Sequence, residues 1–275
     1  MSFRQGSHSC FEIANKINTY FLKNAWYKNC KFLLLYLFKG DQTMRHKQHG
    51  FTLIEIAIVL VIIGLLLGGV LKGQELITSA RVRNIITQQD GIKAAYFGFQ
   101  DRYRALPGDY PAALAVANIP NVSAGIGGDG DGIIDTVAES TAAWTHLSLA
   151  GFLNASYSMT TITEAVSATN TPTNPYNAYL QLIFDAVYGS GGVTPPPVRA
   201  NLKTGNAIPV ALIAEVDRKL DDGNAYTGTF QFSGYNGTGG GAPAVGTCTI
   251  AAAGTTRGQW NVAGESPNCG GASLF

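Results

Sequence analysis

The stretch that decides the fold is Lys47-Gln48-His49-Gly50-Phe51-Thr52-Leu53-Ile54-Glu55, which leads into an uninterrupted apolar run from Ile56 to Leu71. The basic and polar residues end at a glycine, and 21 residues follow from Phe51 to Leu71. As an α-helix, these residues would span about 30 Å, which is enough to cross the hydrocarbon core of a bilayer. One carboxylate, Glu55, lies near the start of this span, where a charge is costly and is usually retained for a partner.

This junction resembles the processing and anchoring segment of type IV pilins and of the related pseudopilins of type II secretion. The resemblance covers residues 44–103 and rests on Gly50 before the junction, Phe51 after it, Glu55, and Gly64 within the span. It implies that a prepilin peptidase cuts after Gly50 and methylates the new amino terminus at Phe51. It further implies insertion in the bacterial inner membrane with the head in the periplasm, then assembly into a pilus or periplasmic filament through helix packing. There, Glu55 would neutralise the amino terminus of a neighbouring subunit.

The charges before the junction agree with this processing route. Arg45, His46 and Lys47 would hold the leader in the cytoplasm while the apolar helix inserts. A conventional secretory signal is cut after its apolar region, whereas this cut would precede it and leave the helix in the mature protein. The alternative is an ordinary single-pass anchor with a glutamate near its end, where snorkelling tolerates the charge. That alternative does not explain the order of residues from Gly50 to Glu55.

Residues 1–50 are expected to be a leader that the working protein lacks. Residues 1–43 contain Cys10, Cys30 and an apolar run from Phe32 to Phe38 that is too short to span a membrane. Family leaders are short, so Met44 would be the true start and residues 1–43 would not be translated. A genuine long leader is the alternative.

Removal of the leader changes the charge balance. Residues 1–50 hold eight of the 19 Lys and Arg residues and two of the 18 Asp and Glu residues, which leaves 11 basic and 16 acidic residues in 51–275. This mildly acidic chain is not suited to binding nucleic acid by charge. The low charged fraction, 13%, and the Gly-, Ser-, Thr-, Asn- and Ala-rich composition beyond residue 120 are typical of a secreted surface protein.

Two cysteines, Cys248 and Cys269, remain after the leader is removed. An even pair in an exported chain predicts a disulfide, with two free thiols as the alternative. Closing a loop of this size would stabilise the fold by about 3 kcal/mol in the chain-entropy model. A carboxyl-terminal disulfide loop also resembles the exposed variable loop of many type IV pilins.

We predict an α+β fold in which a long amino-terminal helix packs on a small antiparallel sheet with long Gly/Ser/Thr-rich loops, as in pilins. Residues 51–71 form the transmembrane part of the helix, 72–105 its soluble part, and 106–275 the head. Pro107 and Gly108 should end the helix. Strands are expected at Tyr179–Val187, Ile208–Val216 and Tyr226–Phe232, with turns and short strands elsewhere beyond the helix. Apolar positions at steps of three and four predict the buried face of the soluble part: Val82, Ile85, Ile86, Ile92, Tyr96, Phe99 and Tyr103.

The sharpest chemical motif is Asp129-Gly130-Asp131-Gly132-Ile133-Ile134-Asp135. Alternating carboxylates around a glycine turn are how calcium loops supply oxygen ligands. With Gly132 as the turn glycine, Asp129 and Asp131 fill the third and fifth loop positions, Ile133 offers its carbonyl, and Asp135 fills the ninth.

The calcium loop is nevertheless incomplete. Its first and twelfth positions fall on Gly127 and Ala138, which have no carboxylate. Glu139, Asp109 or the Asp221-Asp222 pair could complete a cage. The alternative, which the incomplete loop favours, is a cluster of Asx turns whose carboxylates accept hydrogen bonds from backbone amides. Ca²⁺ is therefore a possible ligand rather than an expected one.

No residue pattern predicts catalysis. His146 is the one histidine beyond residue 50, and its neighbours Trp144 and Leu147 favour a packing role. The sequence has no phosphate-binding loop, dinucleotide fingerprint or Cys-x-x-Cys pair. We therefore expect a structural subunit and not an enzyme. The cysteine pair favours a pilin, a calcium loop would favour a pseudopilin, and a membrane-tethered periplasmic binding protein is a distant third.

Overall fold

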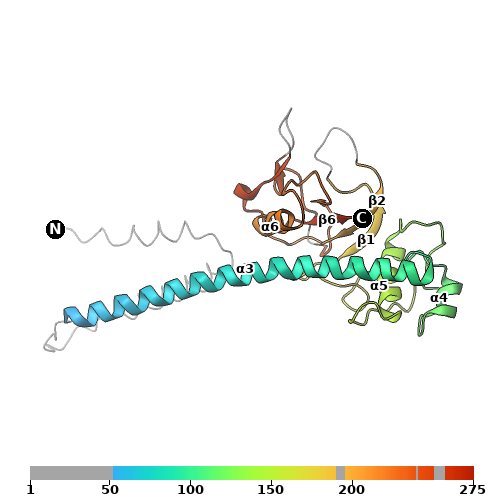
Figure 1. Ribbon diagram of the computed structural model, residues 1–275, viewed down its shortest axis with the longest axis horizontal. Helices are drawn as coiled ribbons and strands as arrows, with labels where there is room; N and C mark the ends of the chain where they lie inside the picture. Colours follow the sequence, from blue (N-terminus) through green and yellow to red (C-terminus); the bar gives the residue numbers. More distant parts are fainter. Residues whose placement is uncertain (1–51, 190–195, 240, 251–257) are drawn as a thin grey trace, which may run out of the picture. The chain divides into compact units, whose positions relative to one another are not determined.

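The computed structural model describes residues 52–189, 196–239, 241–250 and 258–275. It divides the chain into two units, Met1–Ile62 and Ile63–Phe275, which are described separately. The expected leader, with Gly50 and Phe51, lies outside the described residues. The fold combines a long apolar amino-terminal helix with an antiparallel sheet, so the predicted α+β class is confirmed (Figure 1).

The long helix, α3, runs from Leu53 to Tyr103. Its residues 53–72 are all exposed, whereas the part after residue 81 buries one face. It ends four residues before Pro107, and Arg104 directly after it has a positive φ of 55°. Most of the predicted stripe is buried and its other two members, Ile86 and Tyr103, are half-buried. The fully buried face consists of Val82, Ile85, Gln89, Ile92, Ala95, Tyr96 and Phe99.

The main sheet has four antiparallel strands in the order β1-β2-β6-β3. Its strands are β1 (Gln181–Asp185), β2 (Arg199–Lys203), β3 (Phe230–Phe232) and β6 (Gly271–Leu274). β6 pairs with β2 on one side and with β3 on the other, so the latest strand in the chain lies inside the sheet. A second, two-stranded sheet joins β4 (Thr249–Ile250) to β5 (Gln259–Trp260).

The predicted strand at Ile208–Val216 is wrong, because helix α6 occupies Val210–Leu220. Its start follows Pro209, whose φ of −58° suits a helix entry but not the middle of a strand. The buried residues Val210, Ile213 and Asp217 recur at helical spacing, a period that a nearly continuous apolar run conceals.

The other predictions for the head are met unevenly. β1 lies within the predicted Tyr179–Val187, and β3 occupies only the end of the predicted Tyr226–Phe232. β2 and β6 were not predicted, because they are short and lack a run of large apolar residues. Two helices lie where only turns and strands were expected: α4 (Ala112–Asn118) and α5 (Val137–Leu149).

Two hydrophobic clusters connect these elements. One joins Tyr96 and Phe99 of α3 to Trp144 of α5 and to Leu182 and Leu202 of the sheet. The other joins residues of α3 to α6, to β3 and to the disulfide cysteines. Both clusters use the buried face of α3, so this helix supports the head along its second half.

A buried ion pair crosses from β1 to β2. Lys203 Nζ contacts Asp185 Oδ2, and Asn201 Nδ2 donates to Asp185 Oδ1 at 2.9 Å. The Lys203 side chain is 3% exposed, and burial lowers its pKa while the Asp185 hydrogen bond and charge oppose that shift. Asp185, which interrupts the apolar pattern of β1, is therefore the charge that makes the buried lysine tolerable.

Candidate processing and assembly site

The start of α3 is organised by Thr52 and Glu55. The Thr52 amide and the Thr52 hydroxyl both donate to Glu55 Oε2 at 2.9 Å, and the Glu55 amide points back to Thr52 Oγ1 at 3.4 Å. This reciprocal pattern is a capping box, in which each side chain satisfies the other residue's free amide. The Glu55 carboxylate thus lies beside the amide that directly follows Phe51.

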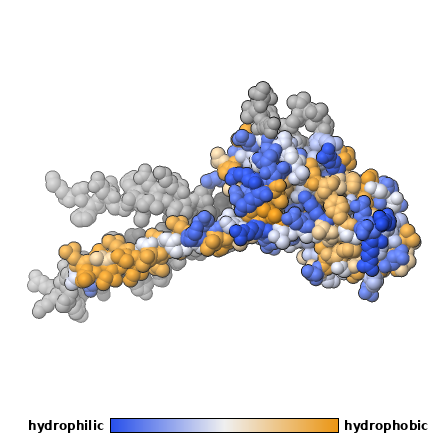
Figure 2. All heavy atoms as spheres, viewed as in Figure 1, coloured by the Kyte–Doolittle hydropathy of each residue, from blue (hydrophilic) through white to orange (hydrophobic). Residues whose placement is uncertain are grey.

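The apolar span behind Glu55 has an exposed surface. Every residue from Leu53 to Leu71 is exposed, with Leu53 at 93%, and this part of α3 forms the continuous hydrophobic surface at one end of the helix in Figure 2. Within the described residues, α3 is the one helix that is long and apolar enough to cross a membrane. An apolar surface of this extent requires a lipid or protein environment.

Polar groups begin where the predicted span ends. Lys72 Nζ contacts Glu75 Oε2 at 2.7 Å, one helical turn apart on the exposed surface. The helix continues through this point without interruption. The predicted boundary between residues 71 and 72 is thus a change of surface chemistry within one element.

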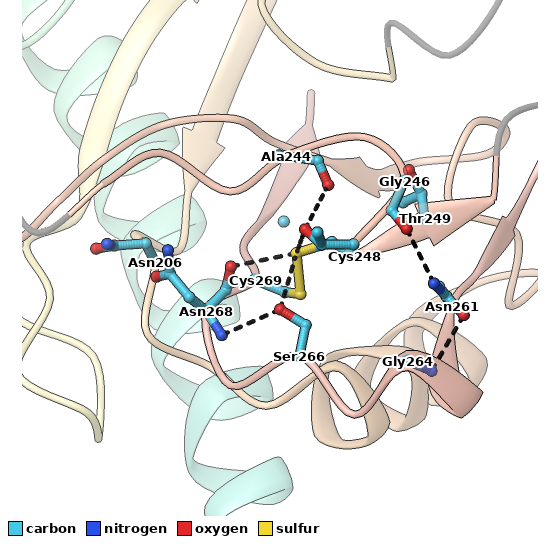
Figure 3. Close-up of a disulfide and its surroundings, with 12 residues drawn as sticks. Asn206, Ala244, Gly246, Cys248, Thr249, Asn261, Gly264, Ser266, Asn268 and Cys269 are labelled. Atoms are coloured by element: carbon cyan, nitrogen blue, oxygen red, sulfur yellow. Dashed lines mark hydrogen bonds between the residues drawn. A yellow bond between two sulfur atoms is a disulfide. The ribbon is translucent and has the colours of Figure 1, made fainter.

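Cys248 and Cys269 form a disulfide, and described residues around it form a local hydrogen-bond network (Figure 3). The Cys248 amide donates to the Ala244 carbonyl at 3.0 Å, and the Asn261 amide donates to the Cys248 carbonyl at 2.9 Å. The Asn261 side chain donates to the Gly246 carbonyl at 3.0 Å. The described residues beside Cys248 are therefore joined to Asn261 by hydrogen bonds and to Cys269 by the disulfide.

The carboxylates of the expected calcium motif accept hydrogen bonds from backbone amides. Asp129 Oδ1 accepts from the Asp131 amide at 3.2 Å, and Asp131 Oδ1 accepts from the Ile133 amide at 2.9 Å. Asp109 adds two more, from the Gly130 and Gly132 amides at 2.8 and 3.0 Å. These are the contacts that the alternative of Asx turns predicts.

The same region brings three carboxylates together: one oxygen each from Asp109, Asp129 and Glu139 lies within 4.8 Å of the others. Asp131 and Asp135 are not in this group. Glu139 Oε2 accepts from the Asp135 and Thr136 amides at 3.1 and 3.2 Å and forms a capping box at the start of α5. Burial raises the pKa of Asp109 and its amide partners lower it, while the Asp131 and Asp129 charges add to the rise.

A second acidic group lies at the carboxyl end of α6, where oxygens of Asp217, Asp221 and Asp222 approach within 4.8 Å of one another. The Trp260 indole Nε1 donates to Asp217 Oδ2 at 2.6 Å. Sequence reasoning noticed Asp221 and Asp222 but missed Asp217. Its four-residue separation from Asp221 is informative only once the segment is known to be a helix.

His146 is buried and bonded to two backbone groups. The Gly108 amide donates to His146 Nδ1 at 3.0 Å, which leaves the proton on Nε2, 3.3 Å from the Ile126 carbonyl. The ring is stacked parallel to Phe99 with 6.0 Å between centroids. Burial lowers the pKa of His146 to about 4, and the Ile126 carbonyl opposes the shift. These contacts assign His146 a packing role.

An exposed apolar helix that starts with a capped carboxylate, directly after a basic stretch, defines a membrane-anchored class of protein. Residues 45–71 match the model of the prokaryotic N-terminal methylation motif. They are thus a prepilin-type cleavage and methylation segment, which the long apolar helix continues. Comparison with curated proteins and with solved structures gives no match for the chain.

Proposed function

We propose that the chain is a structural subunit of a type IV pilus or pilus-like filament. A prepilin peptidase cleaves it after Gly50 and methylates Phe51. The subunit first lies in the bacterial inner membrane with its head in the periplasm. It then assembles with identical or related subunits by packing its apolar helix among theirs. The methylation motif supports the processing steps.

The observation that carries the assembly step is the exposed apolar surface from Leu53 to Leu71 with a single carboxylate at its start. Two environments could cover such a surface, the bilayer before assembly and other helices afterwards. Glu55 Oε2 is occupied by Thr52. A carboxylate has about four acceptor positions, so Glu55 can also receive the ammonium group of a neighbour's Phe51.

We also propose that the role is structural rather than enzymatic. His146, the one histidine beyond residue 50, has both ring nitrogens directed at backbone groups of the core. In this arrangement the imidazole holds Gly108 and Ile126 in place, and proton exchange with a substrate would require both contacts to break.

Mass spectrometry of the protein from its native membrane, together with the sheared surface fraction, tests this function. We expect an amino-terminal peptide that begins with N-methylated Phe51, no residues from 1–50, and the same species in the filament fraction. A chain that keeps residues before Gly50 would overturn the processing step. A correctly processed chain that never enters any filament would overturn the assembly step alone.

The alternative is a type II secretion pseudopilin with a calcium-stabilised loop, which the group of Asp109, Asp129 and Glu139 favours. Equilibrium binding of Ca²⁺ to the full chain and to Asp129→Asn separates the two functions. Loss of a bound ion in the variant, together with filaments that remain periplasmic, would support the pseudopilin. Surface filaments would support the pilus.

A further inference from the structure

The carboxyl end of α6 concentrates negative charge. Asp217 and Asp221 lie one turn apart on the helix, and Asp222 follows in the chain. Three carboxylate oxygens within 4.8 Å repel one another, and a shared proton or cation relieves this repulsion beyond what their hydrogen-bond donors do. The helix dipole adds to this effect, because its carboxyl end carries partial negative charge and favours cations.

Asp217 is the residue that points to a ligand. It is completely buried, and within the described part of the chain its Oδ1 makes no hydrogen bond, although Oδ2 accepts from Trp260. A buried carboxylate oxygen without a partner costs free energy that proteins normally recover by pairing or by metal coordination. Burial raises the pKa of Asp217 to about 6; the Trp260 hydrogen bond opposes the rise, the Asp222 and Asp221 charges add to it, and the Gly223 amide opposes it.

The two basic residues in the last turn of α6 pair with Glu215 rather than with the aspartates. Arg218 and Lys219 lie between Asp217 and Asp221 in the chain, and both contact Glu215 at 3.2 Å. The partner of Asp217 must therefore come from outside these side chains.

A cavity opens beside one member of this group, Asp222. A cavity of about 630 Å³ lies at the end of α6, and its wall includes Asp222, Gly223 and Trp260. Trp260 is the residue that donates to Asp217, so the wall of the cavity and the buried carboxylate are in direct contact. A cavity of this size admits a hydrated cation.

We propose that Asp217, Asp221 and Asp222 bind a hard divalent cation of the Ca²⁺ type at the carboxyl end of α6, separate from the Asp129 segment. Carboxylate oxygens are the ligands that such cations prefer, and water from the cavity completes the coordination. The cation links α6 to the disulfide loop, because Trp260 lies between Cys248 and Cys269 in the chain and is hydrogen-bonded to Asp217.

Binding is tested with the full, processed chain in detergent by titration with Tb³⁺, excited through tryptophan, and by competition with Ca²⁺. We expect sensitised luminescence that saturates and that Ca²⁺ reverses. In Asp221→Asn the stoichiometry should fall by about one ion per chain, because a charged oxygen ligand is lost. The substituted asparagine keeps an oxygen for the Thr229 and Phe230 amides that Asp221 Oδ2 now accepts, which preserves the local fold.

Asp129→Asn is the matched control, since it removes one carboxylate from the other acidic group. It should keep the ion that Asp221→Asn loses. Unchanged stoichiometry in Asp221→Asn, or loss of the only ion in Asp129→Asn, would overturn the proposal.

Thermal unfolding of Asp217→Asn supplies a second readout that does not depend on luminescence. The melting temperature of the unsubstituted protein should rise by about 5 °C when free Ca²⁺ is a hundredfold above its dissociation constant. Asp217→Asn should fold without the ion and show no rise. If Ca²⁺ does not shift the melting temperature of the unsubstituted protein, Asp217 is a neutral acid and the site does not exist.

Discussion

At the scale of single residues, Glu55 combines two roles that substitutions can separate. It completes the capping box with Thr52, and its charge is the proposed partner of a neighbouring amino terminus. The capping role needs only an acceptor oxygen, which glutamine also provides. The pairing role needs the negative charge.

We expect Glu55→Ala and Glu55→Gln both to insert and to be processed, yet to be missing from sheared filaments. Immunoblots of membrane and filament fractions measure the outcome. Normal filaments from Glu55→Gln but not from Glu55→Ala would reduce the role of Glu55 to helix capping. Normal filaments from both variants would refute the proposed pairing.

We expect His146 to make the head less stable in acid. Its folded pKa of about 4 lies below the unfolded value of 6.5, so the unfolded chain takes up the proton first as the pH falls. The stabilising effect of the neutral ring is complete above pH 6.5 and is lost down to about pH 4. Between pH 7 and pH 5 the free energy of unfolding should fall by about 2 kcal/mol through this residue.

Urea unfolding of the unsubstituted protein and of His146→Asn at the two pH values tests this prediction. Asp217 acts in the opposite direction, because its raised pKa makes the folded state take up a proton first. The difference between protein and variant isolates the histidine. Equal pH dependence in both proteins would contradict the assignment.

At the scale of elements, the pairing of β1 with β2 depends on a charge inside the sheet. Asp185→Ala should lower the free energy of unfolding by about 3 kcal/mol, because it leaves the Lys203 ammonium buried without a partner. Chemical denaturation measures the change. The double variant Asp185→Leu/Lys203→Met should lose less than Asp185→Ala alone, since no unpaired charge remains. A larger loss in the double variant would show that packing, not charge, dominates there.

The elements also differ in how well the sequence predicts them. α3 could be predicted because both of its parts have a clear pattern, a continuous apolar run and then a stripe at helical spacing. α6 could not, since residues 210–214 are apolar at every position and fit either period. β2 and β6 are specified by neighbours distant in the chain, and their own residues carry little strand preference. The acidic groups depend on such contacts too, which explains why Asp217 was missed.

At the scale of the whole molecule, the disulfide joins the start of the two-stranded sheet to the segment just before β6 of the four-stranded sheet. Cys269 is bonded through its backbone to Ile208, just before α6, and β6 starts two residues later. Cys248→Ala/Cys269→Ala should lower the free energy of unfolding by about 3 kcal/mol. Unfolding with and without reductant measures this loss. Reductant should not change the free energy of unfolding of the double variant. If reductant also leaves that of the unsubstituted protein unchanged, the disulfide has no stabilising role.

The position of β6 means that the sheet can be completed only at the end of synthesis. The ribosome makes the apolar helix first and residues 271–274 after β1, β2 and β3, yet β6 separates β2 from β3 in the finished sheet. The apolar helix can consequently insert in the membrane while the sheet of the head still lacks β6, which lies between β2 and β3. Until β6 has left the ribosome and paired, the edges of β2 and β3 are open to other strands, and a chaperone that shields them would act during that interval.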